Sequence, residues 1–336
     1  MRKAITPIIA IIILLLITMS LAASAWLFLS VYAGGMTSKL IQQSYGSEEG
    51  NTVMITNIGE ADIHTDELTV LVSNEPAQIL NPQLIEEGGS AFISFEAIQL
   101  GQVNVKFVAP GNSFSYNVDI NPEGITGLAA HWAFDGGSMA DSTGSNNGVL
   151  GDGTCMKGSG ACPSVTDGKA GDGLQFDGND DYARIPSQII GGSDEITIAF
   201  WLSVPVQESN YRRILSDEGG IDVFFTTDGT NGLYGYVGDS GSGGWLLSNE
   251  DLTGGVWNHV VLTASASDGK VYSYINGNPA GDNYNNVGFT SATIDDLFIG
   301  SGYDLAHKLS GSVDELMVFS RVLTEKEISA LHAWAS

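Results

Sequence analysis

The feature that most limits the fold of this chain is an uncharged, strongly apolar segment near its N-terminus. Residues 4–38 contain no Asp, Glu, Lys or Arg, and the basic pair Arg2-Lys3 stands directly before them. A helix over the apolar run 8–33 would be about 39 Å long, which exceeds the ~30 Å hydrocarbon layer of a membrane. Because such a surface must leave water, we expect this segment to lie in a membrane or against other apolar helices.

Three roles for this apolar helix are open. A cleaved secretory signal would use the small residues 23–25 (Ala-Ser-Ala) as its cleavage site, although the apolar run continues through residues 26–29. A plain signal anchor would keep Arg2 and Lys3 on the cytoplasmic side of the membrane and place the rest of the chain outside. The third role is a pilin leader, and it follows from a resemblance.

The N-terminus resembles that of archaeal type IV pilins and archaellins. The resemblance rests on the segment Arg2-Lys3-Ala4-Ile5-Thr6-Pro7 and on the Ile- and Leu-rich run after it. It implies that a dedicated peptidase cuts between Ala4 and Ile5, and that the mature helix packs with like subunits in a filament. Many bacterial pilins carry Glu five residues into the mature chain, where this sequence has Ile9.

Composition restricts the partners of the remaining chain. The formal net charge is −26, from 39 acidic and 13 basic residues. Because phosphate groups are neutralised by Lys and Arg, this balance indicates that nucleic acid is not a partner. The chain has two cysteines, Cys155 and Cys162, in one short loop. Outside a cell such a pair favours a disulfide, and a zinc site would need two further ligands.

Short strand patterns separated by turn clusters fill the chain after residue 50. We assign residues 1–36 to the leader and apolar helix, and residues 37–120 to a small β-sandwich, the head domain that the pilin resemblance implies. Its strands are expected at residues 52–56, 68–72, 91–95, 103–108 and 114–120. Residues 121–126 are expected to form a short linker.

Residues 127–336 continue the strand pattern and are expected to form one large antiparallel sandwich. Asn276-Gly277 indicates a two-residue hairpin turn. Thr324-Glu325-Lys326-Glu327 is a capping box, so a short C-terminal helix should begin there. The fold class is therefore mainly β, with an apolar helix at one end and a short helix at the other.

Residues 127–334 resemble the laminin-G-like jelly rolls of the concanavalin A-like lectin/glucanase class. Eight phrases carry the resemblance in order: GLAAHWAFD at 127–135, DSTGSNNG at 141–148, GLQFDGNDDY at 173–182, IAFWL at 198–202, WNHV at 257–260, YING at 274–277, GSVDEL at 311–316 and LTEKEI at 323–328. The resemblance implies adhesion or recognition of an extracellular glycan or protein, with one structural Ca²⁺. The chain would then be a surface subunit, anchored in a membrane or assembled in a filament.

Catalysis is not indicated. Glucanases of the resembling class place acidic residues at alternate positions of one strand, so that the side chains share a face, and no such run occurs in residues 127–336. Asp314 and Glu315 are neighbours in an expected strand and should point to opposite faces. Two alternatives stay open: a membrane-anchored carbohydrate-active enzyme, and a structural filament subunit that binds no ligand.

Two clusters of oxygen-bearing side chains are candidates for holding Ca²⁺, which binds carboxylate and carbonyl oxygens. The first joins carboxylates of strands that should lie side by side: Asp135, Asp141 and Asp314. The second is an acidic loop, whose members also form turns: Asp177, Asn179, Asp180 and Asp181. No organic cofactor is expected, because no phosphate-binding glycine loop precedes a helix.

Aromatic residues in loops are the candidates for ligand contact, since they offer a flat apolar face beside polar groups. Four are expected in loops: Trp245, Tyr211, Tyr284 and Tyr303. Three others fall in strand patterns and are expected in the core: Trp132, Trp201 and Trp257. The histidines show no partner at the spacing of a metal site or a catalytic triad.

Overall fold

The computed structural model describes residues 39–44, 50–155, 161–205, 212–217, 221–225, 233–237, 245–246, 252–267, 269–280 and 292–334. The apolar segment 4–38 and the expected cleavage site at Ala4 and Ile5 lie outside these ranges. Within them, no helix is long and apolar enough to cross a membrane.

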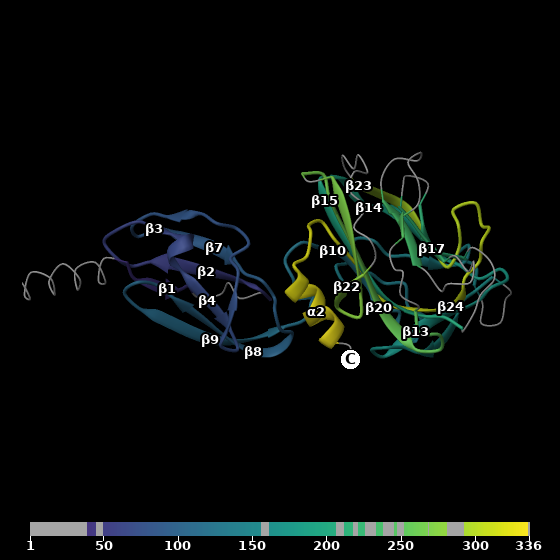
Figure 1. The fold of residues 1–336 in the computed structure, drawn as a ribbon, viewed down its shortest axis with the longest axis horizontal. Coiled ribbons are helices and arrows are strands. Elements are labelled where there is room, and N and C mark those ends of the chain that lie inside the picture. Colours follow the sequence, from purple (N-terminus) through teal and green to yellow (C-terminus); the bar gives the residue numbers. More distant parts are fainter. Residues whose placement is uncertain are drawn as a thin grey trace, which may run out of the picture. The chain divides into compact units, whose positions relative to one another are not determined.

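The chain divides into two compact units (Figure 1). Unit 1 comprises Met1–Phe95 and Val103–Val118, and unit 2 comprises Glu96–Gln102 and Asp119–Ser336. Every strand pair in the described ranges of both units is antiparallel, as the short connections predict.

Unit 1 is a small β-structure with apolar side chains between its sheets. Its strands form three sheets: β1 (Ile41–Gln43), β2 (Thr52–Asn57) and β7 (Ser90–Ser94); β5 (Glu75–Ala77), β4 (Thr69–Val72), β8 (Gly101–Val108) and β9 (Ser113–Ile120); and β3 (Ile63–His64) with β6 (Leu84–Ile85). A short 3-10 helix, η1 (Thr65–Glu67), precedes β4. Phe95 and Phe107 meet edge to face, with ring centroids 5.9 Å apart. The five expected strands are all present, with ends shifted by at most two residues.

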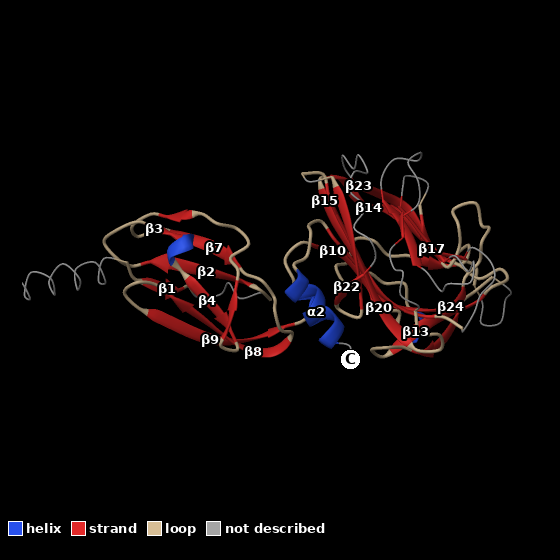
Figure 2. Cartoon of the chain, viewed as in Figure 1, coloured by secondary structure: helices blue, strands red, loops and turns tan. Residues whose placement is uncertain are grey.

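Unit 2 contains two larger sheets (Figure 2). The eight-stranded sheet consists of β12 (Ser164–Asp167), β13 (Asp172–Asp177), β24 (Ser310–Phe319), β15 (Glu195–Ser203), β20 (Trp257–Ser265), β21 (Lys270–Ile275) and β22 (Asn278–Ala280), with β10 (Leu128–Trp132) also paired to β24. The seven-stranded sheet consists of β11 (Val149–Leu150), β14 (Ala183–Ser193), β23 (Ala292–Ile299), β16 (Arg212–Ser216), β17 (Ile221–Phe225), β18 (Leu233–Val237) and β19 (Trp245–Leu246).

The core of unit 2 lies between these two sheets. Trp132 and Phe200 from the larger sheet pack in one cluster with Ile185 and Leu297 from the other. Because both sheets bury one face in a common core, unit 2 is a β-sandwich, and the expected large antiparallel sandwich is confirmed. Of the tryptophans expected in the core, Trp132 is there. Trp201 is also buried, on the opposite face of its sheet, whereas Trp257 is only half-buried, so its expected core position is wrong.

Strand β24 contains a β-bulge that changes which face its acidic residues occupy. Val313 and Leu316 both belong to the core, so Asp314 and Glu315 lie between two inward-facing residues. The pairing of β15 with β24 shifts register here, and Glu315 has a φ of 50°. Both carboxylates therefore lie on the outer face of the sheet. The expectation that they point to opposite faces is wrong, because the bulge adds one residue to the strand.

Local sequence signals in unit 2 are confirmed at three places. Ile275 pairs with Asn278 across a two-residue turn, in which Asn276 and Gly277 have φ values of 52° and 77°. Cys155 and Cys162 form a disulfide, as expected. The C-terminal helix also forms, as α2 (Glu325–Trp334).

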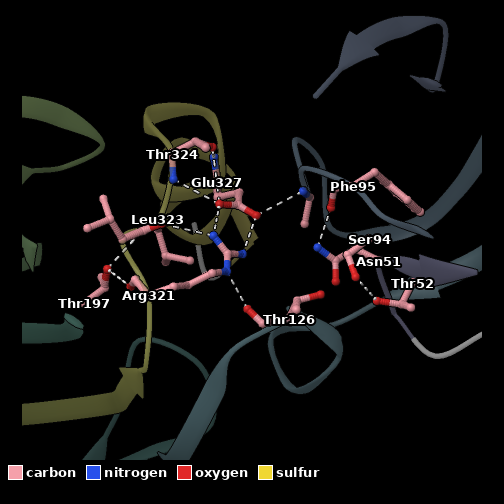
Figure 3. A network of polar contacts seen from close by, with 12 residues as sticks. Asn51, Thr52, Ser94, Phe95, Thr126, Thr197, Arg321, Leu323, Thr324 and Glu327 are labelled. Atoms are coloured by element: carbon pink, nitrogen blue, oxygen red, sulfur yellow. Dashed lines mark hydrogen bonds and ion pairs between the residues drawn. The ribbon is translucent and has the colours of Figure 1, made fainter. Parts of the chain in front are cut away.

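The start of α2 is anchored by a buried ion pair (Figure 3). The Thr324 N–H donates to Glu327 at 3.0 Å and the Glu327 N–H to Thr324 Oγ1 at 3.3 Å, which completes the capping box. The guanidinium of Arg321 donates to both oxygens of Glu327, at 2.7 and 2.8 Å. Arg321 also donates to the Thr126 carbonyl at 2.7 Å, so the helix start is bound to the chain entering β10.

Candidate functional site

Two loops of unit 2 form the surface that carries most of the described candidate residues. The acidic loop, residues 177–182, connects β13 to β14, and the Tyr303 loop, residues 300–309, connects β23 to β24. Arg212, at the start of β16, donates from Nη1 to the carbonyls of Gly178 and Lys308 at 3.2 and 2.7 Å. One guanidinium thus binds both loops. We call residues 177–182 and 300–309 together the loop surface.

The Tyr303 loop is held in one conformation by its own backbone. The Gly302 N–H donates to the Ala306 carbonyl at 2.8 Å, and the Leu305 N–H donates to Gly302 at 2.9 Å. Leu305 and His307 have φ values of 61° and 57°, which side chains other than glycine rarely adopt. Such backbone is found at sites where a side chain must be presented in one direction.

This loop presents apolar side chains to solvent. Tyr303 is 54% exposed and Leu305 is 47% exposed. The Tyr303 N–H donates to Ser216 Oγ at 3.3 Å, which ties the exposed residue to β16. Of the aromatic candidates for ligand contact, Tyr303 is the one whose side chain the structure describes, and it is exposed as expected. Tyr211 and Tyr284 lie outside the described residues, and for Trp245 only the backbone, in β19, is described.

The acidic loop gathers three carboxylates. Ligand oxygens of Asp177, Asp180 and Asp181 all lie within 4.8 Å of one another. Asp181 is buried, and this burial together with the charges of Asp177 and Asp180 raises its pKa. Asn179 donates to Asp177 from its backbone and side chain, at 2.8 and 3.0 Å, and lowers the pKa of that carboxyl. Three clustered carboxylates suit a hard cation such as Ca²⁺.

Lys308 lies beside this acidic loop. Its Nζ sits 4.4 Å from the ring centroid of Tyr182. Burial lowers the pKa of Lys308, although the attraction of Asp177, Asp180 and Asp181 opposes this shift. A cation bound by the triad would therefore share its carboxylates with one ammonium group.

The three residues of the first candidate calcium cluster, Asp135, Asp141 and Asp314, do not gather at one point of the structure. Asp135 Oδ1 accepts the Asp172 N–H at 2.8 Å. Asp314 Oδ2 accepts the N–H groups of Lys169 and Ala170 at 2.6 and 3.0 Å. Both carboxylates thus hold the turn between β12 and β13 by accepting hydrogen bonds from its backbone.

Asp141 serves a separate loop. Its carboxylate accepts the N–H groups of His131, Thr143 and Asn146 at 2.9, 3.0 and 2.9 Å. Hydrogen bonds of this kind outweigh the effect of burial and lower the pKa of Asp141. Asp135 and Asp314 thus accept hydrogen bonds at one turn and Asp141 at a separate loop, and the three carboxylates do not form one cluster. Among the described residues, the group whose carboxylates lie close enough to hold a metal ion is the acidic triad of Asp177, Asp180 and Asp181.

One cluster of ionisable side chains was not predicted from the sequence. His131 is buried between Glu123 and Glu315, with one carboxylate at each ring nitrogen. Glu123 lies in the expected linker and Glu315 in the bulge, 184 residues after His131. No local spacing connects these residues, so only the folded chain shows that they meet.

Unit 2 is an antiparallel β-sandwich, and part of it matches a known family. Residues 177–329 match the family described as the concanavalin A-like lectin/glucanases superfamily, under the name Laminin_G_3. The match covers the acidic loop, the Tyr303 loop and the first half of α2. The resemblance to this class that the sequence suggested is confirmed for this segment, and the pilin resemblance is not shown by it.

Solved structures with a similar fold come from several sources. Domain 4 of AbnA, a GH43 extracellular arabinanase from Geobacillus stearothermophilus solved with arabinotriose, is 21% identical over 61% of this chain and 98% of its own, with a TM-score of 0.47. The binding domain of Paraclostridial Mosquitocidal Protein 1 is 17% identical, at a TM-score of 0.49, and covers 61% of this chain. The botulinum neurotoxin serotype D binding domain is 14% identical, at a TM-score of 0.47, over 62% of this chain.

This chain spans about half of each toxin binding domain, at 52% of their length. At these identities and TM-scores the similarities carry no argument about function. A comparison with curated protein sequences found no match.

Proposed function

We propose that this chain is a cell-surface subunit that displays a ligand-binding module of concanavalin A-like fold. The exposed Tyr303 on its fixed loop, beside the acidic loop, is the observation that carries the proposal. A ring held in one orientation can stack on a sugar or an apolar protein side chain at little entropic cost. The ligand class is an extracellular glycan or a protein surface.

The display of this module rests on the sequence. The uncharged segment 4–38 after Arg2-Lys3 supplies the hydrophobic attachment, and the acidic, strand-rich remainder suits an aqueous exterior. We favour a type IV pilin-like subunit, processed between Ala4 and Ile5 and assembled with like subunits in a filament. A plain membrane anchor would leave the chain uncut at that bond, and a cleaved signal would remove the segment.

Calcium remains a prediction for the acidic triad of Asp177, Asp180 and Asp181. A cation there would neutralise repulsion among the carboxylates and stiffen the loop beside Tyr303. It would thus act on binding through the shape of the loop surface.

A glycan array tests the recognition function. The full-length chain in detergent is applied in millimolar Ca²⁺ and again with a chelator. We expect binding to a restricted set of glycans, weakened by the chelator if the triad holds a cation. No binding under either condition, on glycans or on extracted cell-surface proteins, would favour the structural filament subunit instead.

A further inference from the structure

The strongest feature outside the loop surface is a buried histidine with an acidic partner on each side. His131 is 2% exposed and lies on the outer face of the larger sheet of unit 2. Its Nδ1 is 2.8 Å from Glu123 Oε1, and its Nε2 binds Glu315 Oε2. Both ring nitrogens therefore face a carboxylate.

When both glutamates are ionised, this arrangement requires a charged ring. A neutral imidazole has one N–H donor and one acceptor nitrogen, whereas an imidazolium has two donors. If His131 were neutral, one carboxylate would face a lone pair in a buried site, which is a costly contact. With two ionised glutamates beside it, the geometry assigns two N–H groups to His131.

The three residues come from separate elements. Glu123 belongs to the short 3-10 helix η2 (Pro122–Gly124), which Asn121 caps by accepting the Gly124 N–H at 2.9 Å. His131 lies in β10, and Glu315 is the bulge residue of β24. η2 is part of the segment that follows β9 and leads into β10. Through His131 that segment is bound to the last strand of the sandwich.

We propose that Glu123, His131 and Glu315 form a proton-dependent latch, in which the imidazolium holds η2 against β10 and β24 and loss of its proton releases η2. Glu123 is the releasing contact, because its side chain is 40% exposed while that of Glu315 is 4% exposed. Water can replace His131 as the partner of Glu123 but not of Glu315.

The charges around the latch set its pH range. Burial alone would lower the pKa of His131, but Glu123 and Glu315 outweigh it and raise the pKa to about 9. The latch therefore stabilises the fold fully below the unfolded value near 6.5, and this stabilisation is lost as pH rises through about 9. The hydrogen bond with His131 also lowers the pKa of Glu123, so acid weakens the latch only as pH falls below about 4.5.

Two further carboxylates lie near the latch. Asp141 accepts the backbone N–H of His131, and Asp314 precedes Glu315 in the bulge. Burial raises the pKa of Asp314 to about 7, so this group becomes negative before His131 loses its proton. Both charges favour the imidazolium, and neither competes with Glu123 for a ring nitrogen.

Hydrogen exchange read by mass spectrometry on the full-length chain tests the latch. Protection factors, corrected for the intrinsic pH dependence of exchange, are compared at pH 7 and pH 10. We expect the peptide covering residues 119–127 to lose at least about tenfold protection, while peptides from β15 and β20 keep theirs. Unchanged protection of residues 119–127, or loss of equal size in β15 and β20, would overturn the latch.

A pair of matched variants separates the latch from general alkaline loosening. Glu123→Gln keeps the shape of the side chain and removes its negative charge, which favours the imidazolium. The pH midpoint at which residues 119–127 lose protection should therefore fall by at least about one pH unit. Glu325→Gln, which changes an exposed acid of α2, should keep the wild-type midpoint. A Glu123→Gln midpoint equal to that of the wild type would refute the role of Glu123.

Discussion

At the scale of single residues, the turn between β12 and β13 shows how two carboxylates organise a loop by accepting backbone hydrogen bonds. Asp135 and Asp314 accept N–H groups from both sides of this turn. The turn must approach these carboxylates closely. A Cβ added at Gly171 would lie 2.2 Å from Asp135 Oδ1, and one at Gly168 would lie 2.5 Å from Asp314 Oδ2.

A glycine substitution tests this packing. Gly171→Ala combines a strained φ of +72° with the contact to Asp135, whereas Gly192→Ala has a φ of +66° and open space around the added Cβ. Both variants incur the backbone cost, of about 1 kcal/mol, and only Gly171→Ala should lose a further ~1–3 kcal/mol of unfolding free energy. Urea denaturation measures the difference, and equal destabilisation of the two variants would contradict the tight fit.

At the scale of elements, α2 depends on one buried ion pair. Glu327 is fully buried, and Arg321 binds both of its oxygens. Removing one partner of such a pair leaves an uncompensated buried charge. Helix α2 should therefore be more sensitive to Arg321 than to its N-cap residue, Thr324.

Two variants compare these contributions. Arg321→Leu should lower the unfolding free energy by about 3–5 kcal/mol, because Glu327 is left unpaired. Thr324→Ala removes only the cap hydrogen bonds and should cost about 1 kcal/mol. Thermal or urea unfolding of both variants provides the check. A loss in Arg321→Leu no larger than that in Thr324→Ala would show that the ion pair does not anchor the helix.

Elements with a local sequence signal could be predicted, and those that depend on distant contacts could not. The capping box at Thr324 and the Asn276-Gly277 turn are each encoded within four residues, so their position was foreseen. The bulge at Asp314-Glu315 has no such signal, because it appears in the pairing with β15, which is distant in the sequence. The latch of His131 was missed for the same reason.

The candidate site was foreseen only in its local parts. The acidic loop was visible because Asp177, Asp180 and Asp181 are close in the sequence. For the distant set of Asp135, Asp141 and Asp314, the sequence does not say which backbone donors will reach each carboxylate, and the structure shows these donors at a turn and a separate loop. The exposure of Tyr303 was expected, but the positive φ values of Leu305 and His307, which fix its loop, were not.

At the scale of the whole molecule, the chain combines an apolar N-terminal segment with two acidic β-units. The net charge of −26 favours solubility of the displayed units and opposes binding to polyanions. We propose that unit 2 provides the recognition surface and that the latch of His131 controls how firmly η2 is held. The central claim is that the loop surface around Tyr303 binds the ligand.

Titration calorimetry of the strongest array ligand tests this claim most directly. The wild-type chain is compared with Tyr303→Ala and with Trp334→Ala, which removes an exposed aromatic side chain from α2. We predict that Tyr303→Ala weakens binding at least about tenfold, the loss of roughly 1.4 kcal/mol expected for one aromatic contact, while Trp334→Ala binds as the wild type. Equal affinity of Tyr303→Ala and the wild type would contradict the account.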